Sequence, residues 1–324
     1  MRLLEDVHDI TLITGSNGRK GCTANCLGCY LGKYGDGKPF YQGTMDQVHE
    51  LVSMLPNLKR VALFGNPDIS VDTVFCNQVA KALQERNILV YLFTSGVGGI
   101  KVTEQILNGL NKTNVGRMYF SIDTLDDDKL SEIKGIQISH KDIFPSIEYC
   151  NRFGIQTGII ATIWSINMDE DLIAFTDYWK SLGVAKVKIH YGSLEAADGK
   201  IAHVPMDKVL EIRKKYGHLI RLPYIFTSDD EYKIYLSRVV ANKEIRCSDF
   251  NGEVFFYLEK DGIKWSFNCS IATTVYPEYI TDIKEQKLPF FSNVTLCPVA
   301  ERALGYECST MHTVCRYYKD PKSN

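Results

Sequence analysis

The stretch ITLITGSNGRKGCTANCLGC, residues 10–29, joins a short β-rich run to three closely spaced cysteines. Residues 10–14 predict a buried strand, and Cys22, Cys26 and Cys29 follow on the loop after it with the spacing C-x3-C-x2-C. Three thiolates can bind three irons of a four-iron cluster and leave the fourth iron without a protein ligand. The alternatives are a zinc site completed by a distant residue, or cysteines that are simply buried. Because a structural zinc site normally has four ligands in paired spacings, the pattern favours the iron–sulfur cluster.

Strands and helices alternate along most of the chain that follows. Further buried strands are predicted at residues 60–64, 88–94, 117–122, 154–163 and 185–190. Helices are predicted at residues 44–55, 72–86, 102–111, 141–153 and 169–182. Strands separated by helices form a parallel sheet of right-handed βαβ units, and six strands are fewer than the eight of a closed barrel. The predicted fold class is therefore α/β, a partial (β/α)6 barrel with functional groups at the carboxyl ends of its strands.

The composition is that of a globular chain of 324 residues with little net charge. Thirty-seven Lys and Arg stand against 39 Asp and Glu, without local segregation, so no nucleic-acid partner is expected. The first residues, MRLLEDVHDITLIT, lack the basic start and apolar centre of a signal peptide, and no apolar run approaches the ~18 residues of a membrane span. We therefore expect a cytoplasmic protein with no membrane partner, in which clustered thiols bind metal or do redox chemistry.

The C-x3-C-x2-C motif after the first strand resembles that of the radical S-adenosylmethionine (radical SAM) family, and the resemblance spans residues 8 to about 190. It implies a catalytic [4Fe-4S] cluster at Cys22, Cys26 and Cys29, with S-adenosylmethionine bound at the fourth iron. In that family the reduced cluster cleaves S-adenosylmethionine to a 5′-deoxyadenosyl radical, which takes a hydrogen atom from the substrate. The resemblance also implies anaerobic, oxidoreductase-like chemistry and an external electron donor of the flavodoxin or ferredoxin type.

The loop after the second strand matches a position where the family binds S-adenosylmethionine. Gly65, Asn66, Pro67 and Asp68 stand where the family usually has Gly-Gly-Glu-Pro to receive the methionine amino group. The position matches and the letters differ, so no single ligand is assigned. An ordinary strand-to-helix turn is the alternative.

The ends of the third and fourth strands supply further cofactor-binding candidates. Thr94 and Ser95 end the third strand, and Ser121 with Asp123 resembles the Ser-x-Asp that meets the carboxylate or ribose of the cofactor in related enzymes. A hydroxyl can donate to a carboxylate, and an aspartate can accept from ribose hydroxyls. Asp123 is equally suited to cap the helix that begins near residue 126.

The remaining cofactor-binding candidates lie on the last two strands and beside the motif. Thr162 and Asn167 follow the fifth strand as weaker candidates for adenosine contacts, and Asn167 also suits a helix cap. Tyr30 is predicted to shield the cluster or pack against adenine. Gly28 stands where the family more often has an aromatic residue, so a backbone contact would replace a stack. His190 is a candidate to orient adenine or touch substrate, with a structural role as the alternative.

Two cysteines are isolated, and five crowd the last quarter of the chain. Cys76 and Cys150 fall among apolar helical residues and are predicted to pack in the core. The others are Cys247, Cys269, Cys297, Cys308 and Cys315. Helices are predicted at residues 205–216 and 229–242, and residues 254–268, VFFYLEKDGIKWSFN, predict a hairpin between the first two cysteines of the group.

The spacing C-x14-G-x6-C around this hairpin resembles the start of the SPASM and twitch appendages of radical SAM enzymes, with a longer interval than usual after the glycine. The resemblance implies one auxiliary [4Fe-4S] cluster bound by four of the five cysteines. An open iron with three protein ligands, or zinc in place of the cluster, are the alternatives. Two domains follow, a radical SAM partial barrel at 1–240 and a small auxiliary iron–sulfur domain at 241–324.

Two substrate classes fit this organisation, and no catalytic acid or base is identified. One is a peptide or protein side chain, as in maturases of ribosomally made peptides and in sulfatase-maturating enzymes. The other is a small polar metabolite, such as a sugar, aminocyclitol or nucleoside, as in twitch-type dehydrogenases. Only 21 residues precede Cys22, so no leader-peptide-binding domain is expected, yet the commoner role of members with such an appendage favours the peptide. A non-catalytic iron–sulfur or zinc protein is disfavoured by the open three-cysteine motif.

Overall fold

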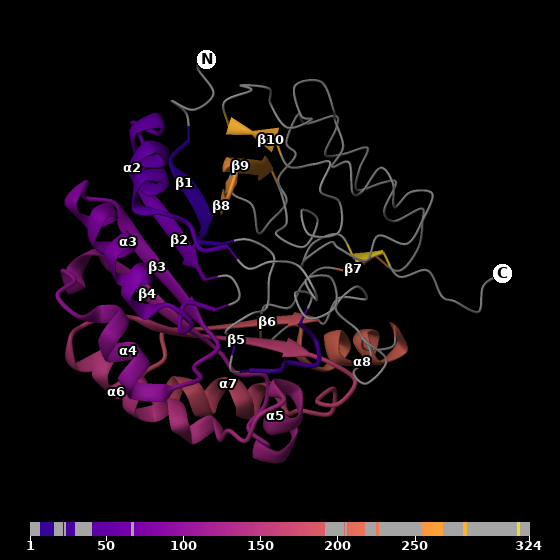
Figure 1. The fold of residues 1–324 in the computed structure, drawn as a ribbon. Helices are drawn as coiled ribbons and strands as arrows, with labels where there is room; N and C mark the ends of the chain where they lie inside the picture. Colours follow the sequence, from indigo (N-terminus) through magenta and orange to yellow (C-terminus); the bar gives the residue numbers. More distant parts are fainter. Residues whose placement is uncertain are drawn as a thin grey trace.

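The computed structural model describes residues 7–15, 22, 24–29, 41–65, 68–191, 204, 206–217, 225–226, 254–267, 281–283 and 316–317. Within them, one nine-stranded sheet has the order β10-β9-β8-β1-β2-β3-β4-β5-β6 (Figure 1). Its central strands are β1 (Asp9–Ile13), β2 (Arg60–Phe64), β3 (Leu89–Thr94), β4 (Val115–Ser121), β5 (Thr157–Ile163) and β6 (Lys186–Tyr191). These six pair in chain order and all in parallel. The predicted partial barrel is confirmed, with small shifts at the strand ends.

Helices between these strands cover one side of the sheet (Figure 1). They are α2 (Met45–Met54), α3 (Thr73–Glu85), α4 (Gly99–Leu107), α5 (Asp127–Lys134), α6 (Phe144–Arg152) and α7 (Leu172–Ser181). The helix predicted at residues 141–153 is divided, because a 3-10 turn at His140–Ile143 precedes α6. Pro145 stands at the start of α6, where its missing N–H costs no hydrogen bond. None of the described helices is long and apolar enough to cross a membrane.

The core lies between the sheet and these helices because the strand residues alternate between two faces. In β2, Val61 and Leu63 are fully buried against the helices, whereas Phe64 on the opposite face is partly exposed. Cys76 of α3 and Cys150 of α6 belong to this core, as predicted. Burial raises the pKa of both thiols, to about 12 for Cys150, so neither is a reactive thiolate at neutral pH.

The hairpin predicted at residues 254–268 is confirmed. Strands β8 (Val254–Glu259) and β9 (Gly262–Phe267) pair in antiparallel fashion around Lys260 and Asp261. The sequence did not predict where the hairpin lies: β8 pairs in parallel with β1, so the hairpin continues the barrel sheet. Gln47 of α2 secures it by donating to the carbonyl of Glu259 at 2.7 Å.

Shorter elements complete the described chain. β10 (Thr281–Asp282) pairs with β9, and β7 (Ile225–Phe226) pairs with β11 (Arg316–Tyr317) in a separate two-stranded sheet. α8 (Met206–Tyr216) confirms the helix predicted at residues 205–216. The helix predicted at residues 229–242 lies outside the described residues. The division into 1–240 and 241–324 stays a prediction.

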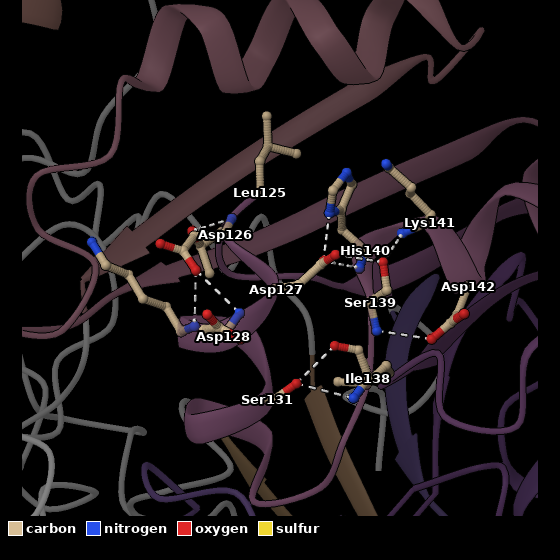
Figure 2. Close-up of polar contacts among 12 residues, drawn as sticks. Leu125, Asp126, Asp127, Asp128, Ser131, Ile138, Ser139, His140, Lys141 and Asp142 are labelled. Carbon is tan, nitrogen blue, oxygen red and sulfur yellow. Dashed lines mark hydrogen bonds and ion pairs between the residues drawn. The ribbon is translucent and has the colours of Figure 1, made fainter.

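Helix α5 matters for the site because it is fixed at both ends. Asp126 caps it by accepting hydrogen bonds from the N–H groups of Asp128 and Lys129. The carboxylate of Asp127 accepts from the Ser139 hydroxyl and from the backbone N–H and ring of His140 (Figure 2). At the other end, Gly135 ends the helix with φ +62°, the left-handed conformation that favours glycine.

The contacts of Asp127 predict a pH-dependent contribution to stability. Partial burial opposes ionisation, but the hydrogen bonds from His140 and Ser139 lower the pKa of Asp127 below its ordinary value. A carboxyl whose pKa falls on folding stabilises the fold above its unfolded pKa of about 4, and this stabilisation is lost as pH falls through the lower folded value.

Asp127→Asn is therefore expected to lower the free energy of unfolding at neutral pH, with the difference from wild type shrinking below about pH 4. Urea unfolding of the metal-free protein between about pH 7 and pH 3 measures it. Asp128→Asn is the matched control, because Asp128 is the exposed next residue of the same helix. A difference that stays constant down to about pH 3 would contradict the assigned role.

Candidate functional site

The three-cysteine loop is bound to the carboxyl end of α5 through its backbone. The N–H of Asn25 donates to the carbonyl of Lys134, and the N–H of Leu27 donates to the carbonyl of Ile133, both at 2.9 Å. The last carbonyls of a helix have no partner within the helix, so the loop satisfies groups that would otherwise be unpaired. Cys22, Cys26 and Cys29, each partly exposed, are presented from this anchored loop.

Two glycines allow the loop to approach its neighbours this closely. A Cβ at Gly135 would collide with the carbonyl oxygen of Asn25, and a Cβ at Gly28 would collide with the indole of Trp164. Trp164 follows β5 directly and is 5% exposed. The indole ring of Trp164 therefore fills the space that a side chain at position 28 would need. The loop is held between the ends of α5 and β5.

The donor set suits the iron–sulfur cluster predicted for it. None of the described His, Cys, Asp and Glu side chains gather in threes as the ligands of a single metal ion do. In a four-iron cluster each thiolate binds its own iron atom. Burial raises the pKa of Cys26 to about 11, while Lys134 acts in the opposite direction by favouring the thiolate. A cluster held by Cys26 would require loss of the thiol proton, next to a cation that favours the charged sulfur.

A buried ion pair joins the end of β4 to the end of α5, to which this loop is bound. The Lys134 ammonium lies 3.1 Å from a carboxylate oxygen of Asp123, and the two side chains are only 4% and 5% exposed. The same ammonium donates to the Ser121 hydroxyl at 3.0 Å. Burial opposes the charge on Lys134, but the Asp123 carboxylate above all raises its pKa above the ordinary value. Asp123 does not cap α5, because Asp126 does.

Asn167 joins the ends of β4 and β5 and is fully buried. Its amide nitrogen donates to the carbonyls of Asp123 at 2.7 Å and Thr162 at 3.0 Å, and its oxygen accepts from the N–H of Trp164 at 2.7 Å. The N–H of Thr162 donates in turn to the Asp123 carboxylate at 2.8 Å. Asn167 does not cap α7, whose cap is Asp171. Its side chain holds together the two strand ends that border the cysteine loop.

Asp68 makes an equivalent junction between the loop after β2 and the end of β3. One carboxylate oxygen accepts from the Thr94 hydroxyl at 3.1 Å and the N–H of Ser70 at 2.8 Å; the other accepts from the N–H of Ser95 at 2.6 Å. A Cβ at Gly65 would collide with the backbone of Asp68, which explains the glycine. This junction brings together four of the predicted site residues: Gly65, Asp68, Thr94 and Ser95.

The face of the sheet opposite the helices carries the remaining described candidates. Ser121, Thr162 and His190 share this face at the strand ends, with Thr162 and His190 paired in register. Two residues earlier on β4, the ring of Tyr119 stacks on Phe93 with centroids 4.7 Å apart. We call this face of the sheet the inner wall. It carries polar side chains at the strand ends and aromatic side chains earlier along the strands.

Several predicted site residues lie outside the described residues. They are Tyr30, Asn66, Pro67, Cys247, Cys269, Cys297, Cys308 and Cys315. Conversely, Lys134 and Trp164 border the loop without having been predicted. The Lys-Gly pair at residues 134–135 carries a usable signal, since glycine commonly follows a helix's last turn, but nothing in the sequence places that turn beside the cysteines.

Comparison with known proteins identifies the family. The model of the radical SAM superfamily matches residues 17–178, which is half of the chain and includes the three-cysteine loop. The protein therefore belongs to the radical SAM superfamily of enzymes, whose chemistry uses S-adenosylmethionine and a [4Fe-4S] cluster. No curated protein sequence matches the chain significantly.

Solved structures of similar fold include SuiB of Streptococcus suis bound to its precursor peptide SuiA, at 14% identity and a TM-score of 0.45, covering 83% of this chain and 51% of SuiB. The methyltransferase TsrM of Kitasatospora setae, with cobalamin and a [4Fe-4S] cluster bound, matches at 13% identity and 0.42, covering 56% and 36%. Methylornithine synthase (PylB) matches at 13% and 0.43, covering 58% and 56%. The chain spans about half the length of SuiB.

Proposed function

We propose that the protein reductively cleaves S-adenosylmethionine and uses the radical produced to abstract a hydrogen atom from a peptide or protein side chain, in the manner of a peptide maturase or a sulfatase-maturating enzyme. The observation that carries the radical chemistry is the placement of the C-x3-C-x2-C loop, anchored to the end of α5 beside the carboxyl ends of β4 and β5. Active sites of such sheets lie at this end of the strands.

In this proposal Cys22, Cys26 and Cys29 hold the catalytic cluster. When bound, the cluster and S-adenosylmethionine supply a 5′-deoxyadenosyl radical, the species that removes hydrogen from the substrate. The task of the chain is then to bind and orient the two molecules and to exclude water and competing hydrogen donors. The anchored loop contributes by fixing the thiols relative to the strand ends.

Polar groups at the strand ends bind S-adenosylmethionine in this proposal. The Ser121 hydroxyl, oriented by Lys134, is available to a carboxylate or hydroxyl of the cofactor. The Asp68 junction fixes Thr94 and Ser95 at the next strand end. Asp123 and Asn167 act by holding the β4 and β5 ends in place, and Thr162 and His190 border the inner wall. Tyr30, Asn66 and Pro67 complete the proposed set from the adjoining loops.

We further propose an auxiliary [4Fe-4S] cluster bound by four of the five C-terminal cysteines, and an electron donor of the flavodoxin or ferredoxin type. The support is the cysteine spacing around the hairpin together with the hairpin's position. β8, which lies between Cys247 and Cys269 in the sequence, pairs with β1, the strand that leads into the catalytic motif. An auxiliary cluster suits removal of a second electron from a substrate radical.

The substrate class is tested by hydrogen transfer into 5′-deoxyadenosine. Reconstituted enzyme is incubated with S-adenosylmethionine, reductant, and either the peptide fraction or the small-metabolite fraction of a fully deuterated extract of the source cells. Deuterium in 5′-deoxyadenosine from the peptide fraction alone is the expected result. Deuterium from the metabolite fraction alone would overturn the peptide proposal in favour of a twitch-type enzyme acting on a small polar metabolite.

A further inference from the structure

A row of stacked aromatic rings crosses the inner wall below the strand ends. The ring of Phe64 on β2 stacks on Phe93 of β3 with centroids 4.1 Å apart, and Phe93 stacks on Tyr119 of β4 at 4.7 Å. A Cβ at Gly158 of β5 would collide with the Tyr119 ring, so this glycine lets the ring lie across the neighbouring strand. The row therefore ends on a ring that reaches from β4 over β5 and is only 4% exposed.

Two cations border this last ring of the row. The Lys188 ammonium of β6 lies 5.0 Å from the centroid of the Tyr119 ring, and the guanidinium carbon of Arg117 lies 5.6 Å from it. An aromatic ring attracts each cation by its electrons. Two like charges around one buried ring nevertheless repel each other, because little solvent screens them. An anion bound beside the ring would relieve this repulsion.

The hydroxyl of Tyr119 has a proton to offer such an anion. Its oxygen accepts a hydrogen bond from Arg117 at 2.9 Å, so its own O–H is left to donate elsewhere. Among the residues that the structure describes, none accepts from this hydroxyl. A hydroxyl that accepts from a charged donor is polarised, which strengthens the bond that it donates. Arg117 is held in turn by donating to Gln156, so it is placed to orient the Tyr119 hydroxyl.

The strands around this ring favour negative charge in a ligand. β2 to β6 contain no Asp or Glu, although the whole chain has 39 of them. Asp68 and Asp123 lie beyond the strand ends and already have partners there. Asp68 accepts hydrogen bonds from the end of β3, and Asp123 pairs with the Lys134 ammonium. This part of the inner wall is therefore complementary to an anion.

We propose that Lys188 and Tyr119, with Arg117 as a positioning residue, form a carboxylate-binding subsite on the inner wall, and that the substrate is an acidic peptide. The inference rests on the proposed peptide function and names the chemistry of that substrate. Tyr119 precedes Ser121 by two residues on β4. Lys188 precedes His190 by two residues on β6, so the subsite lies about 7 Å below the cofactor candidates along both strands. The strand ends are thus left to the cofactor.

The charge of the substrate is tested by blocking the carboxylates of the deuterated peptide fraction. Their conversion to methyl esters with unlabelled methanol is expected to lower deuterium transfer into 5′-deoxyadenosine by the wild-type enzyme about tenfold. Acetylation of the amines in the same fraction is the matched control and is expected to leave the transfer unchanged. S-adenosylmethionine is added unmodified to every sample, so its own carboxylate does not contribute to the difference. Equal transfer from the native and the esterified fractions would overturn the subsite.

Variants assign the effect to the named side chains. Lys188→Met removes the charge at similar length, and Tyr119→Phe removes the hydroxyl but keeps the ring. Each is expected to lower transfer from the native fraction about tenfold and to remove most of the difference between native and esterified peptides.

Two further variants serve as controls. Lys188→Arg keeps the charge and is expected to keep the difference between the two fractions. Lys180→Met, at an exposed lysine of α7, is expected to behave as wild type. A Lys188→Met enzyme that stayed as sensitive to esterification as wild type would contradict the subsite even if its overall activity fell.

The outcomes separate this inference from the function on which it rests. If the native peptide fraction transfers deuterium and esterification has no effect, the peptide proposal stands and the subsite fails. If only the metabolite fraction transfers deuterium, the peptide proposal fails. Esterification of that metabolite fraction then tests the carboxylate subsite by itself, with the same expected loss of transfer.

Discussion

Simultaneous replacement of Cys22, Cys26 and Cys29 by alanine is expected to lower bound iron from about eight to about four atoms per chain, at about four irons per cluster, and to abolish S-adenosylmethionine cleavage. The reason is that these three thiols are the proposed ligands of the catalytic cluster, so without them neither the cluster nor the cofactor is held. The four remaining irons belong to the auxiliary cluster proposed at the C-terminal cysteines. Iron and sulfide analysis after anaerobic reconstitution measures the change.

Cys76→Ala is the matched control for this triple variant. Cys76 is 1% exposed in the helical core, and burial raises its thiol pKa, so it is expected to keep the full iron content. Two outcomes would contradict these cluster assignments. Retention of about eight irons by the triple variant would remove the catalytic assignment, and loss of all iron would remove the second cluster.

Asn167→Ala is expected to destabilise the protein by about 3 kcal/mol, because the change removes three hydrogen bonds to backbone groups, two of them buried. The N–H of Trp164 and the carbonyls of Asp123 and Thr162 all bond to this one side chain. Iron retention is expected to fall as well, since Trp164 packs against Gly28 of the cysteine loop. Urea unfolding of the metal-free protein and iron analysis of the reconstituted protein give the two values.

Asn151→Ala provides the comparison for this variant. Asn151 is exposed at the end of α6 and donates one long hydrogen bond, of 3.3 Å, to the carbonyl of Leu182. A surface change of this kind is expected to cost about 0.5 kcal/mol or less. If Asn167→Ala proved no more destabilising than Asn151→Ala, the junction between β4 and β5 would not be a major source of stability.

The sequence predicted the barrel well because its strands are short, largely apolar runs separated by amphipathic helices. Residues 60–64 illustrate this: the run RVALF is apolar, bounded by polar residues, and forms β2 with the predicted bounds. Predictions were weaker where a turn decided the boundary. Ser139 caps a 3-10 turn before Pro145, and this local chemistry divides the helix predicted at residues 141–153.

For the site, the sequence predicted which residues gather at the strand ends but not what they bond to. Asp68, Asp123 and Asn167 were predicted by position as cofactor contacts, yet their described hydrogen bonds join one strand end to another. Lys134 could not be predicted, because a lysine in a helix's last turn is ordinarily solvated and stabilises the helix dipole. Only the fold brings that turn under the cysteine loop. Long-range contacts of this kind have no local signal in the sequence.

Formation of 5′-deoxyadenosine is the most direct test of radical chemistry in this protein. Anaerobically reconstituted protein is mixed with S-adenosylmethionine and dithionite, and the products are separated by chromatography and identified by mass. Formation of 5′-deoxyadenosine by the wild-type chain, and none by the Cys22/Cys26/Cys29→Ala variant, is the predicted result. Absence of 5′-deoxyadenosine from a wild-type protein with its iron content complete would contradict the central claim that this loop supports radical cleavage of S-adenosylmethionine.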